Sequence, residues 1–260
     1  MLVQRTLTNS INAVGVGLHS GRKISIKLLP AEEDTGIIFR RVDIDPPVEI
    51  KAIVNNVGAT TLATTLIQGE VQISTIEHML SAFAGLGIDN AIIEIDDVEV
   101  PIMDGSSSSF VFLIQSAGIK EQTKPKKFIK IKKEISVETD NGAFVRLSPY
   151  DGFKVTYSLV YDDEKHKQYS SKSTIDFNST TYLKEISRAR TFGFMEEVNM
   201  LKEQNLALGA SEKNAIAIGE DGILNEEGLR SKDEFVKHKI LDVVGDLYFC
   251  LLYTSPSPRD

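Results

Sequence analysis

The chain has 260 residues, 42% of them hydrophobic, so it is long enough for one large domain or two smaller ones with their own cores. Its net charge of −8, with scattered Lys and Arg, argues against a nucleic-acid-binding protein. A single cysteine, Cys250, excludes an internal disulfide framework and favours a reducing compartment. No stretch approaches the roughly 20 apolar residues that span a bilayer, and the N-terminus lacks the apolar segment of a signal peptide. We therefore expect a soluble cytoplasmic protein without a transmembrane segment.

Short β-like runs dominate the first hundred residues, at 24–28, 36–40, 48–54 and 91–95, with turn residues between them. Two helices interrupt this pattern. The first is expected to begin at Ser74-Thr-Ile-Glu77, which has the spacing of a capping box, and to end near Gly85. The second is expected to run from the serine cluster 106–109 to Gly118.

A polar segment at 120–127 separates the two halves and is interpreted as a linker. β-like runs return at 128–131, 144–147, 153–161 and 173–177, and helical patterns follow over 181–190 and 233–246. Each half therefore shows strands followed by helices, the order typical of an α+β protein. We expect a first α+β domain over residues 1–119 and a second over 128–250.

The helix expected over 233–246 has a polar face that could perform chemistry. His238 and Asp242 lie one turn apart on it and point the same way, with Lys239 and Asp246 on the same side. An imidazole and a carboxylate placed in this way could bind one metal ion. The alternative is that these charges form the solvated face of an amphipathic helix.

His78, which follows Glu77 on the first helix, is a second candidate ligand. A hydrolytic zinc site requires three protein ligands, an open position for water and a nearby carboxylate as general base. His78, His238 and Asp242 with Glu77 would supply that set. Glu77 also has a structural alternative, because the glutamate of a capping box only bonds the backbone amide of the N-cap residue. The compact zinc-protease and serine-nucleophile motifs do not occur in the sequence, so spacing alone leaves both interpretations open.

Two further histidines are less informative. His166 lies in a charged loop and is expected to be exposed and without function. His19 lies in the glycine-rich turn 15–21, where one hydrogen bond within the loop is expected and a role in the site is the alternative.

Six segments together resemble the bacterial UDP-3-O-acyl-N-acetylglucosamine deacetylase family, a zinc amidase family that performs the committed step of lipid A synthesis. The resemblance runs in order from Met1 to about Cys250 and implies two similar α+β domains whose helices pack face to face between two β-sheets. The segments are Gly15-Val-Gly-Leu-His-Ser-Gly21, Ser74-Thr-Ile-Glu-His-Met-Leu80, Gly85-Leu-Gly-Ile-Asp-Asn90, Pro101-Ile-Met-Asp-Gly-Ser106, Ser187-Arg-Ala-Arg-Thr-Phe-Gly-Phe194 and Phe235-Val-Lys-His-Lys-Ile-Leu-Asp-Val-Val-Gly-Asp246.

The resemblance also implies roles for individual residues. The zinc ligands are matched by His78, His238 and Asp242, with iron(II) as an alternative ion, and the general base is matched by Glu77. Thr191 matches the hydroxyl that holds the oxyanion. Lys239 matches the cation near the substrate's diphosphate, and Asp246 matches the carboxylate that orients a further catalytic histidine.

The expected substrate is a UDP-linked amino sugar with a buried acyl chain, bound by a chain expected to be monomeric. The nucleotide contact and acyl passage correspond to the aromatic residues Phe192 and Phe194 and to the segment from Met195 to Ala217. Small residues in that segment suit an apolar tunnel, although a packed strand and helix is an equal alternative. The tunnel candidates are Ala207, Ala210, Ala215 and Ala217.

The resemblance ends near residue 251. The segment 251–260 contains two prolines and no apolar periodicity, so it is expected to be a non-native tail in place of a family motif that carries a catalytic histidine. We therefore expect the second domain to be incomplete and the chain to be weakly active or inactive. The alternative function is a catalytically impaired fragment that binds a metal or a nucleotide sugar.

Overall fold

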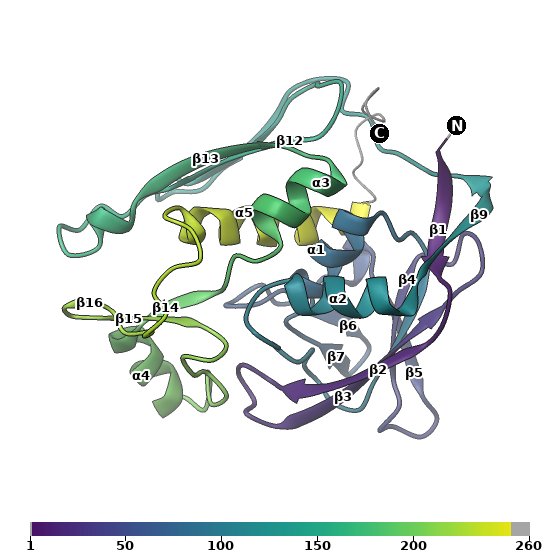
Figure 1. The fold of residues 1–260 in the computed structure, drawn as a ribbon, viewed down its shortest axis with the longest axis horizontal. Helices are drawn as coiled ribbons and strands as arrows, with labels where there is room; N and C mark the ends of the chain where they lie inside the picture. The colour runs from purple at the N-terminus through teal and green to yellow at the C-terminus, as the bar shows by residue number, and fades with distance from the viewer. Residues whose placement is uncertain (1, 251–260) are drawn as a thin grey trace.

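The structure is a computed structural model that describes residues 2–250. It combines helices with several small sheets, which confirms the α+β class (Figure 1). None of the helices in this part of the chain has the length and apolar character of a membrane-spanning segment.

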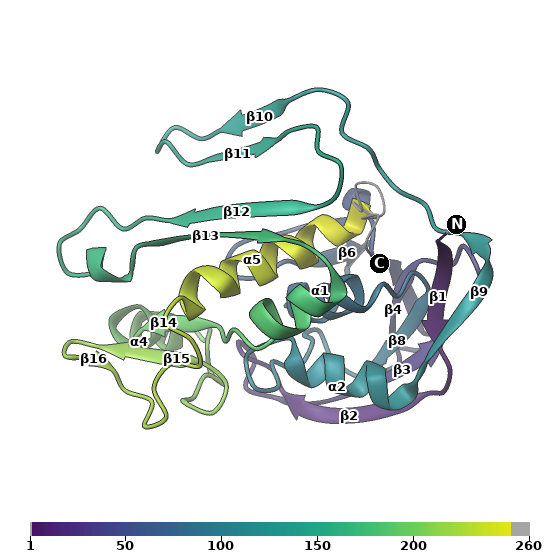
Figure 2. The ribbon, with the colours of Figure 1, turned by 45° about the horizontal axis from the view of Figure 1, so that its top comes forward.

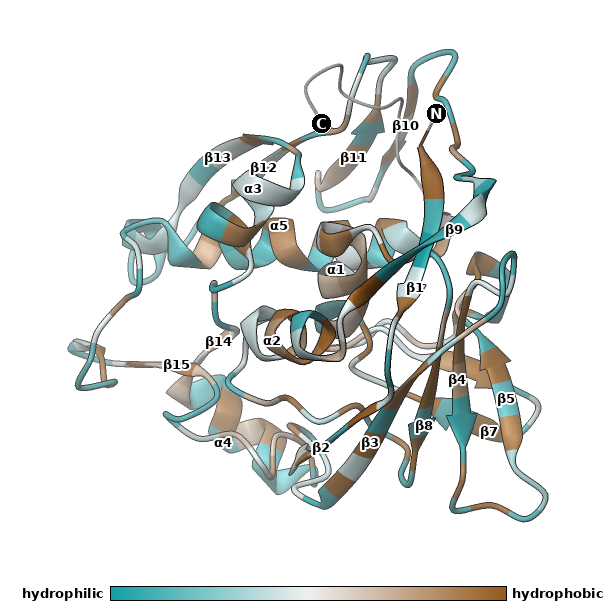
Figure 3. Ribbon diagram, turned by 45° about the vertical axis from the view of Figure 1, so that its right-hand side comes forward, coloured by the Kyte–Doolittle hydropathy of each residue, from teal (hydrophilic) through white to brown (hydrophobic). Residues whose placement is uncertain are grey.

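A five-stranded sheet forms the first layer, in the order β2-β3-β8-β4-β5. Its strands are Ile11–Val16 (β2), Lys23–Pro30 (β3), Ala91–Ile95 (β8), Ile37–Arg41 (β4) and Val48–Lys51 (β5). Neighbours are antiparallel except for β4 and β8. The alternating residues Ile24, Ile26 and Leu28 of β3 are buried, as expected of a sheet with one face on the core. Figure 3 shows the resulting hydropathy stripes along these strands.

Helices form the middle of the molecule. They are Glu77–Leu86 (α1), Ser108–Ala117 (α2) and Glu234–Leu247 (α5), which ends in the short 3₁₀ helix Tyr248–Cys250 (η4). Every residue of α1 is buried, because α1 lies between the first sheet and α5. Its buried residues, including Leu80 and Phe83, share one core with Ile240 and Val244 of α5.

One glycine permits the close approach of α1 and α5. A Cβ at Gly245 would lie 2.1 Å from the carbonyl oxygen of Glu77, a distance that no side chain allows. The backbones of the two helices are therefore in direct contact near the start of α1, where the candidate site lies.

The second layer consists of two β-hairpins on the other side of α5 (Figure 2). They pair Ile135–Glu138 (β10) with Phe144–Leu147 (β11), and Lys154–Leu159 (β12) with Ser171–Asp176 (β13). Each is a separate two-stranded sheet among the described residues. The short 3₁₀ helix Lys167–Tyr169 (η2) lies between β12 and β13, whereas Ser179–Thr181 (α3) and the π-helix Tyr182–Ile186 (η3) follow β13, and η3 packs in the core with α1 and α5. Helices α1 and α5 thus lie between the two strand layers.

A small unit stands beside the start of α5. It contains the strands Phe192–Phe194 (β14), Ile216–Gly219 (β15) and Gly222–Ile223 (β16), with the helix Met195–Glu203 (α4) after β14. The aromatic ring of Phe235 on α5 contacts Phe192, and Phe235 belongs to the same small core as Phe194 and Ile216. This unit therefore rests on the helix that carries His238.

The segment interpreted as a linker is not an isolated connection. Residues Ile119–Pro125 form strand β9, which pairs antiparallel with Val3–Leu7 (β1). Backbone pairing with a strand more than a hundred residues away overrides the polar composition, a long-range effect that local patterns do not carry. The remaining strands, Leu66–Gln68 (β6) and Val71–Ile73 (β7), form a hairpin that follows the 3₁₀ helix Val54–Asn56 (η1).

Three expected elements differ in detail. Residues 128–131 form no strand, the strand expected over 48–54 ends at Lys51, and the helical pattern over 181–190 ends at Ile186. The capping box is also wrong: among the described residues, α1 begins after Ile76 without a side-chain cap, and Ser74 instead bonds the backbone of Val98. The carboxylate of Glu77 is therefore free for another role.

Candidate active site

The close contact of α1 and α5 brings the three predicted metal ligands together. Nε2 of His78 lies 3.6 Å from Oδ1 of Asp242, and Nε2 of His238 lies 3.3 Å from the same oxygen. The two imidazole rings meet edge to face, 4.9 Å apart. One ligand atom from each residue falls within a group no wider than 4.8 Å, which could hold a metal ion. Two imidazoles and a carboxylate are a common donor set for catalytic zinc.

The electrostatics of the metal-free protein suit this use. Burial, reinforced by the neighbouring His238, lowers the pKa of His78 to about 3, and burial lowers the pKa of His238. Burial alone would raise the pKa of Asp242, but His238 and Lys239 beside it bring the net pKa below its usual value. Both imidazoles are thus neutral and the carboxylate charged at neutral pH, the forms that bind a cation.

Two orientations support the same interpretation. Nδ1 of His238 lies 3.0 Å from the carbonyl oxygen of Ala189. Since a carbonyl oxygen only accepts, Nδ1 carries the proton and Nε2 keeps its lone pair toward Asp242. Oδ1 of Asp242 is buried yet has no hydrogen-bond partner among the described residues. An unpartnered buried carboxylate oxygen facing two imidazole nitrogens fits a cation.

Glu77 lies in the same buried space. Its Oε2 accepts a hydrogen bond of 3.1 Å from the amide of Thr64, whose hydroxyl donates to Oδ1 of Asp246 at 2.7 Å. Burial, followed by the nearby charge of Asp242, raises the pKa of Glu77 to about 8. Burial also raises the pKa of Asp246 to about 6, although part of this residue faces solvent. Thr64 was missed in the sequence, because it lies in a segment without any motif.

Lys239 and Phe192 border the cluster. Nζ of Lys239 donates to Oδ2 of Asp242 at 3.1 Å and lies 5.4 Å from the centre of the Phe192 ring. That ring lies 6.3 Å from the His238 imidazole. Thr191 precedes Phe192, and its amide donates to Gly105 O at 2.8 Å. Lys239 and Phe192 thus lie next to the predicted ligands, whereas Thr191 is placed only as the chain neighbour of Phe192.

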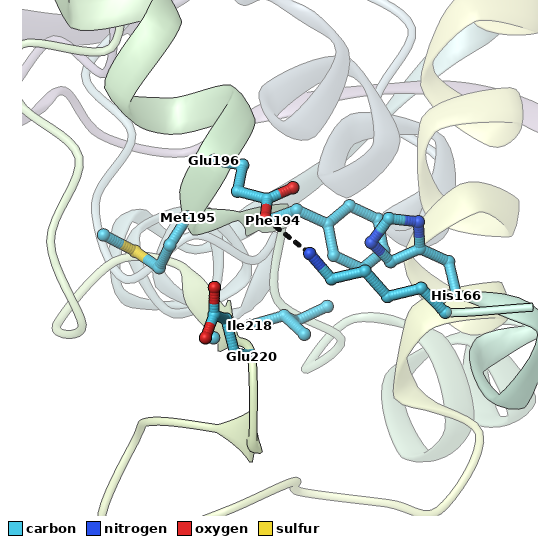
Figure 4. Close-up of a pocket in the computed structure, with 8 residues that line it drawn as sticks. His166, Phe194, Met195, Glu196, Ile218 and Glu220 are labelled. Atoms are coloured by element: carbon cyan, nitrogen blue, oxygen red, sulfur yellow. Dashed lines mark hydrogen bonds and ion pairs between the residues drawn. The ribbon is translucent and has the colours of Figure 1, made fainter.

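The other predicted substrate residues lie further along the small unit. The Phe194 ring packs against His166, with the ring centres 4.0 Å apart, beside a cavity of about 40 Å³ (Figure 4). Ala217 lies on β15 opposite Gly193, whereas Ala207 is buried in the loop after α4. The residues that line this cavity do not include the four alanines. Their assignment to an acyl passage stays a prediction.

The expectation that His166 is exposed was wrong. Its ring is mostly covered, because it stacks on Phe194 and Nδ1 pairs with Asp163 at 2.8 Å. A charged loop therefore supplies one packing residue that charge alone does not reveal.

In the glycine-rich turn, the backbone of His19 bonds Glu99 and Leu208, and both ring nitrogens are buried without a hydrogen-bond partner among the described residues.

Comparison with known proteins agrees with this geometry. Residues 4–254 match the UDP-3-O-acyl N-acetylglycosamine deacetylase family. The chain is 57% identical over 248 residues to the UDP-3-O-acyl-N-acetylglucosamine deacetylase of Pseudomonas entomophila (strain L48), covering 95% of this chain and 82% of that protein. For the proteins of the same name, the identity is 56% to that of Cellvibrio japonicus (strain Ueda107) and 57% to that of Thioalkalivibrio sulfidiphilus (strain HL-EbGR7), covering 95% of this chain and 82% and 81% of those proteins. The chain therefore belongs to the UDP-3-O-acyl N-acetylglycosamine deacetylase family.

Proposed function

We propose that this chain hydrolyses the N-acetyl group of a UDP-linked, 3-O-acylated N-acetylglucosamine in a zinc-dependent reaction, the committed step of lipid A synthesis. Acetate is released and a free amine remains on the sugar. The observation that carries the proposal is the convergence of His78, His238 and Asp242 within 4.8 Å, beside the buried carboxyl group of Glu77. Membership of the deacetylase family supports the choice of substrate.

His78, His238 and Asp242 would hold one zinc ion, with iron(II) as the alternative. When bound there, such an ion polarises the acetamide carbonyl and lowers the pKa of water. The donor set fits this role, since Nε2 of His238 is held unprotonated by the bond from Nδ1 to Ala189 O.

Glu77 acts as the general base. Its carboxylate takes a proton from the attacking water, and the Thr64 amide on Oε2 fixes its orientation. A general base works best when its pKa lies near the working pH, and burial raises the pKa of Glu77 in that direction. The proton that it gains is then available for the departing amine.

Thr191 and Asp246 complete the reacting groups. The Thr191 hydroxyl donates to the oxyanion that develops from the acetamide carbonyl, a contact worth roughly 3 kcal/mol in comparable sites. Asp246, one turn beyond Asp242 on α5, matches the family carboxylate that orients a further histidine, and that histidine belongs to the motif that residues 251–260 are expected to replace. The hydrogen bond from Thr64 to Asp246 ties this carboxylate to the general base.

Substrate binding uses the border of the site. Lys239, anchored by Asp242 and lying over Phe192, neutralises charge on the diphosphate. Phe192 and Phe194 contact the nucleotide sugar and its acyl chain, and burial of that chain supplies binding energy at about 25 cal/mol per Å² of apolar area. Ala207, Ala210, Ala215 and Ala217 border the acyl passage.

The test is acetate release from the UDP-linked acylated sugar, measured with metal-free and zinc-reloaded chain. We expect activity only after reloading, and slower turnover of UDP-N-acetylglucosamine without the acyl chain. A folded, zinc-loaded chain that releases no acetate would reject catalysis by this chain and leave the alternative, an impaired fragment that binds a metal or a nucleotide sugar.

The expected degree of impairment needs a parallel measurement. Residues 251–260, on which that expectation depends, lie outside the described part of the chain. We expect turnover below about a tenth of that of the Pseudomonas relative. A value within tenfold would show that the chain is not impaired. The monomeric state and cytoplasmic location likewise stay predictions.

A further inference from the structure

The connection between η3 and β14 has no regular structure, yet its peptide groups are individually held. The carbonyl of Arg188 accepts from the Arg230 side chain, and that of Ala189 faces His238. The amide of Thr191 donates to Gly105 O, and its carbonyl accepts from the Ile216 amide. A segment outside helices and strands that is bonded this completely is fixed in one conformation.

One peptide unit of this segment connects two residues of α5. In the unit that joins Ala189 to Arg190, the carbonyl oxygen lies 3.0 Å from Nδ1 of His238, and the N–H donates to Oε1 of Glu234 at 3.1 Å. Glu234 and His238 are four residues apart, hence one turn apart on the helix. The two ends of the same peptide plane are thus held by a carboxylate and by a candidate metal ligand.

The Arg190 side chain also donates hydrogen bonds to the carboxylate of Glu234. Its Nε donates to Oε1 of Glu234 at 2.9 Å and its Nη2 to Oε2 at 3.2 Å, a two-point contact. Nη1 pairs with Glu227, and Nη2 also donates to Gly228 O. Both Arg190 and Glu234 are almost completely buried. Removing two charges from water is costly, so a buried pair of this kind is weak evidence for a role in stability alone.

We propose that the Arg190–Glu234 ion pair is a positioning element for the metal centre. The ion pair sets the orientation of the Ala189–Arg190 peptide, whose carbonyl fixes the tautomer and ring plane of His238. It also fixes the position of the backbone at Thr191, which follows Arg190 in the chain. His78 has no such support, since its Nδ1 is buried without a partner among the described residues. The inference rests on the proposed function, because His238 is taken as a metal ligand.

Mutation of a group that hydrogen-bonds a metal ligand typically lowers metal affinity or activity by about 10- to 100-fold. Glu234→Gln keeps the shape of the side chain but removes its charge, and it turns an amide NH₂ toward Arg190. Arg190→Lys keeps the charge but loses the planar two-point contact. The matched control is Lys237→Gln, on the same helix as Glu234. It removes the ion pairs of Lys237 with Glu185 and Asp233, and Lys237 has no hydrogen bond to the Ala189–Arg190 peptide.

The experiment measures zinc affinity by competition with a chromophoric chelator, and the tautomer of His238 by ¹⁵N NMR of the metal-free full chain. We expect Glu234→Gln to weaken zinc binding about 10- to 100-fold and to reduce the population with a proton on Nδ1. Arg190→Lys should show a smaller loss, and Lys237→Gln should leave both readouts unchanged.

The outcomes separate the inference from the proposed function. Unchanged zinc affinity and tautomer in folded Glu234→Gln would overturn the positioning role. So would a loss of zinc that only follows a loss of folded protein in both variants. A wild-type chain that binds no zinc, but whose His238 tautomer responds to Glu234→Gln, would keep the positioning role and reject the metal site.

Discussion

Asp242 illustrates how the site depends on single side chains. Its Oδ1 faces the Nε2 atoms of His78 and His238, while its Oδ2 accepts a hydrogen bond from Lys239. The carboxylate therefore links a candidate metal position to a candidate phosphate contact. The sequence predicted that His238, Lys239 and Asp242 could share one face of a helix. It did not reveal Thr64, Ala189 or Glu234, because their roles depend on which backbone groups and side chains they meet in three dimensions.

Replacement of Glu77 tests its role at this scale. We expect Glu77→Gln to lower the deacetylation rate about 10²- to 10⁴-fold, the usual contribution of a general base. The change should also raise the stability of the metal-free protein at high pH. The folded-state pKa of Glu77, about 8, lies above its ordinary value of 4.5, so the folded state binds the proton more tightly and stability falls as pH rises between these values.

The magnitude of this gain is on the order of a few kcal/mol above pH 8. The difference in stability is measured by thermal unfolding of the metal-free wild type and Glu77→Gln, from below pH 4.5 to above pH 8. Parallel pH profiles of wild type and Glu77→Gln would contradict the burial of an ionisable group at this position.

At the scale of elements, the site depends on how closely α1 and α5 approach. Each helix alone supplies only part of the candidate metal site, since His78 comes from α1 and His238 and Asp242 come from α5. The helix positions were predictable from apolar periodicity and from the glycines that follow α1 and α2. Their contact was raised by the set of possible zinc ligands and then implied by the family resemblance, since periodicity carries no information on which helices meet.

Gly245→Ala tests this contact. Alanine in a helix interior ordinarily stabilises by about 1 kcal/mol relative to glycine. Here the new Cβ would lie 2.1 Å from Glu77 O, so α1 must shift. We expect a net destabilisation of about 1–3 kcal/mol and weaker zinc binding. The control is Asn199→Ala on the exposed face of α4, which should be neutral or slightly stabilising. An increase in stability for Gly245→Ala would refute the close helix contact.

Considered as a whole, both halves of the chain contribute β-hairpins to an outer strand layer. In the first half, two hairpins flank the central strand β8, and in the second, β10–β11 and β12–β13 lie side by side as separate hairpins above α5 (Figure 2). Strands β1, β2, β6, β7, β9, β10 and β14–β16 were not expected, but the order of the other strands and of the helices α1, α2 and α5 was predictable from the sequence. The pairing of β1 with β9 was not, because strand pairing across more than a hundred residues leaves no local pattern.

The hairpin β10–β11 gives a prediction about the whole molecule. Val137 and Val145 face each other across it, about two-thirds exposed, beside the exposed Phe144. Exposed apolar side chains on a two-stranded sheet favour self-association. We expect Val137→Thr/Val145→Thr to reduce association in sedimentation velocity, with a change in stability of less than about 0.5 kcal/mol. Val14→Thr, at an exposed position of β2, is the control and should leave association unchanged. Equal association of the wild type, the double variant and Val14→Thr would show that this hairpin is not the surface through which the chains associate.

The measurement that tests the central claim most directly is the zinc content of the purified chain, compared with His78→Ala and with the control His166→Ala. We expect about one zinc per chain in the wild type and in His166→Ala, and loss of that zinc in His78→Ala while circular dichroism still shows a folded protein. A folded wild-type chain without zinc or iron, or a His78→Ala variant that keeps its metal, would contradict the assignment of His78, His238 and Asp242 as a metal centre.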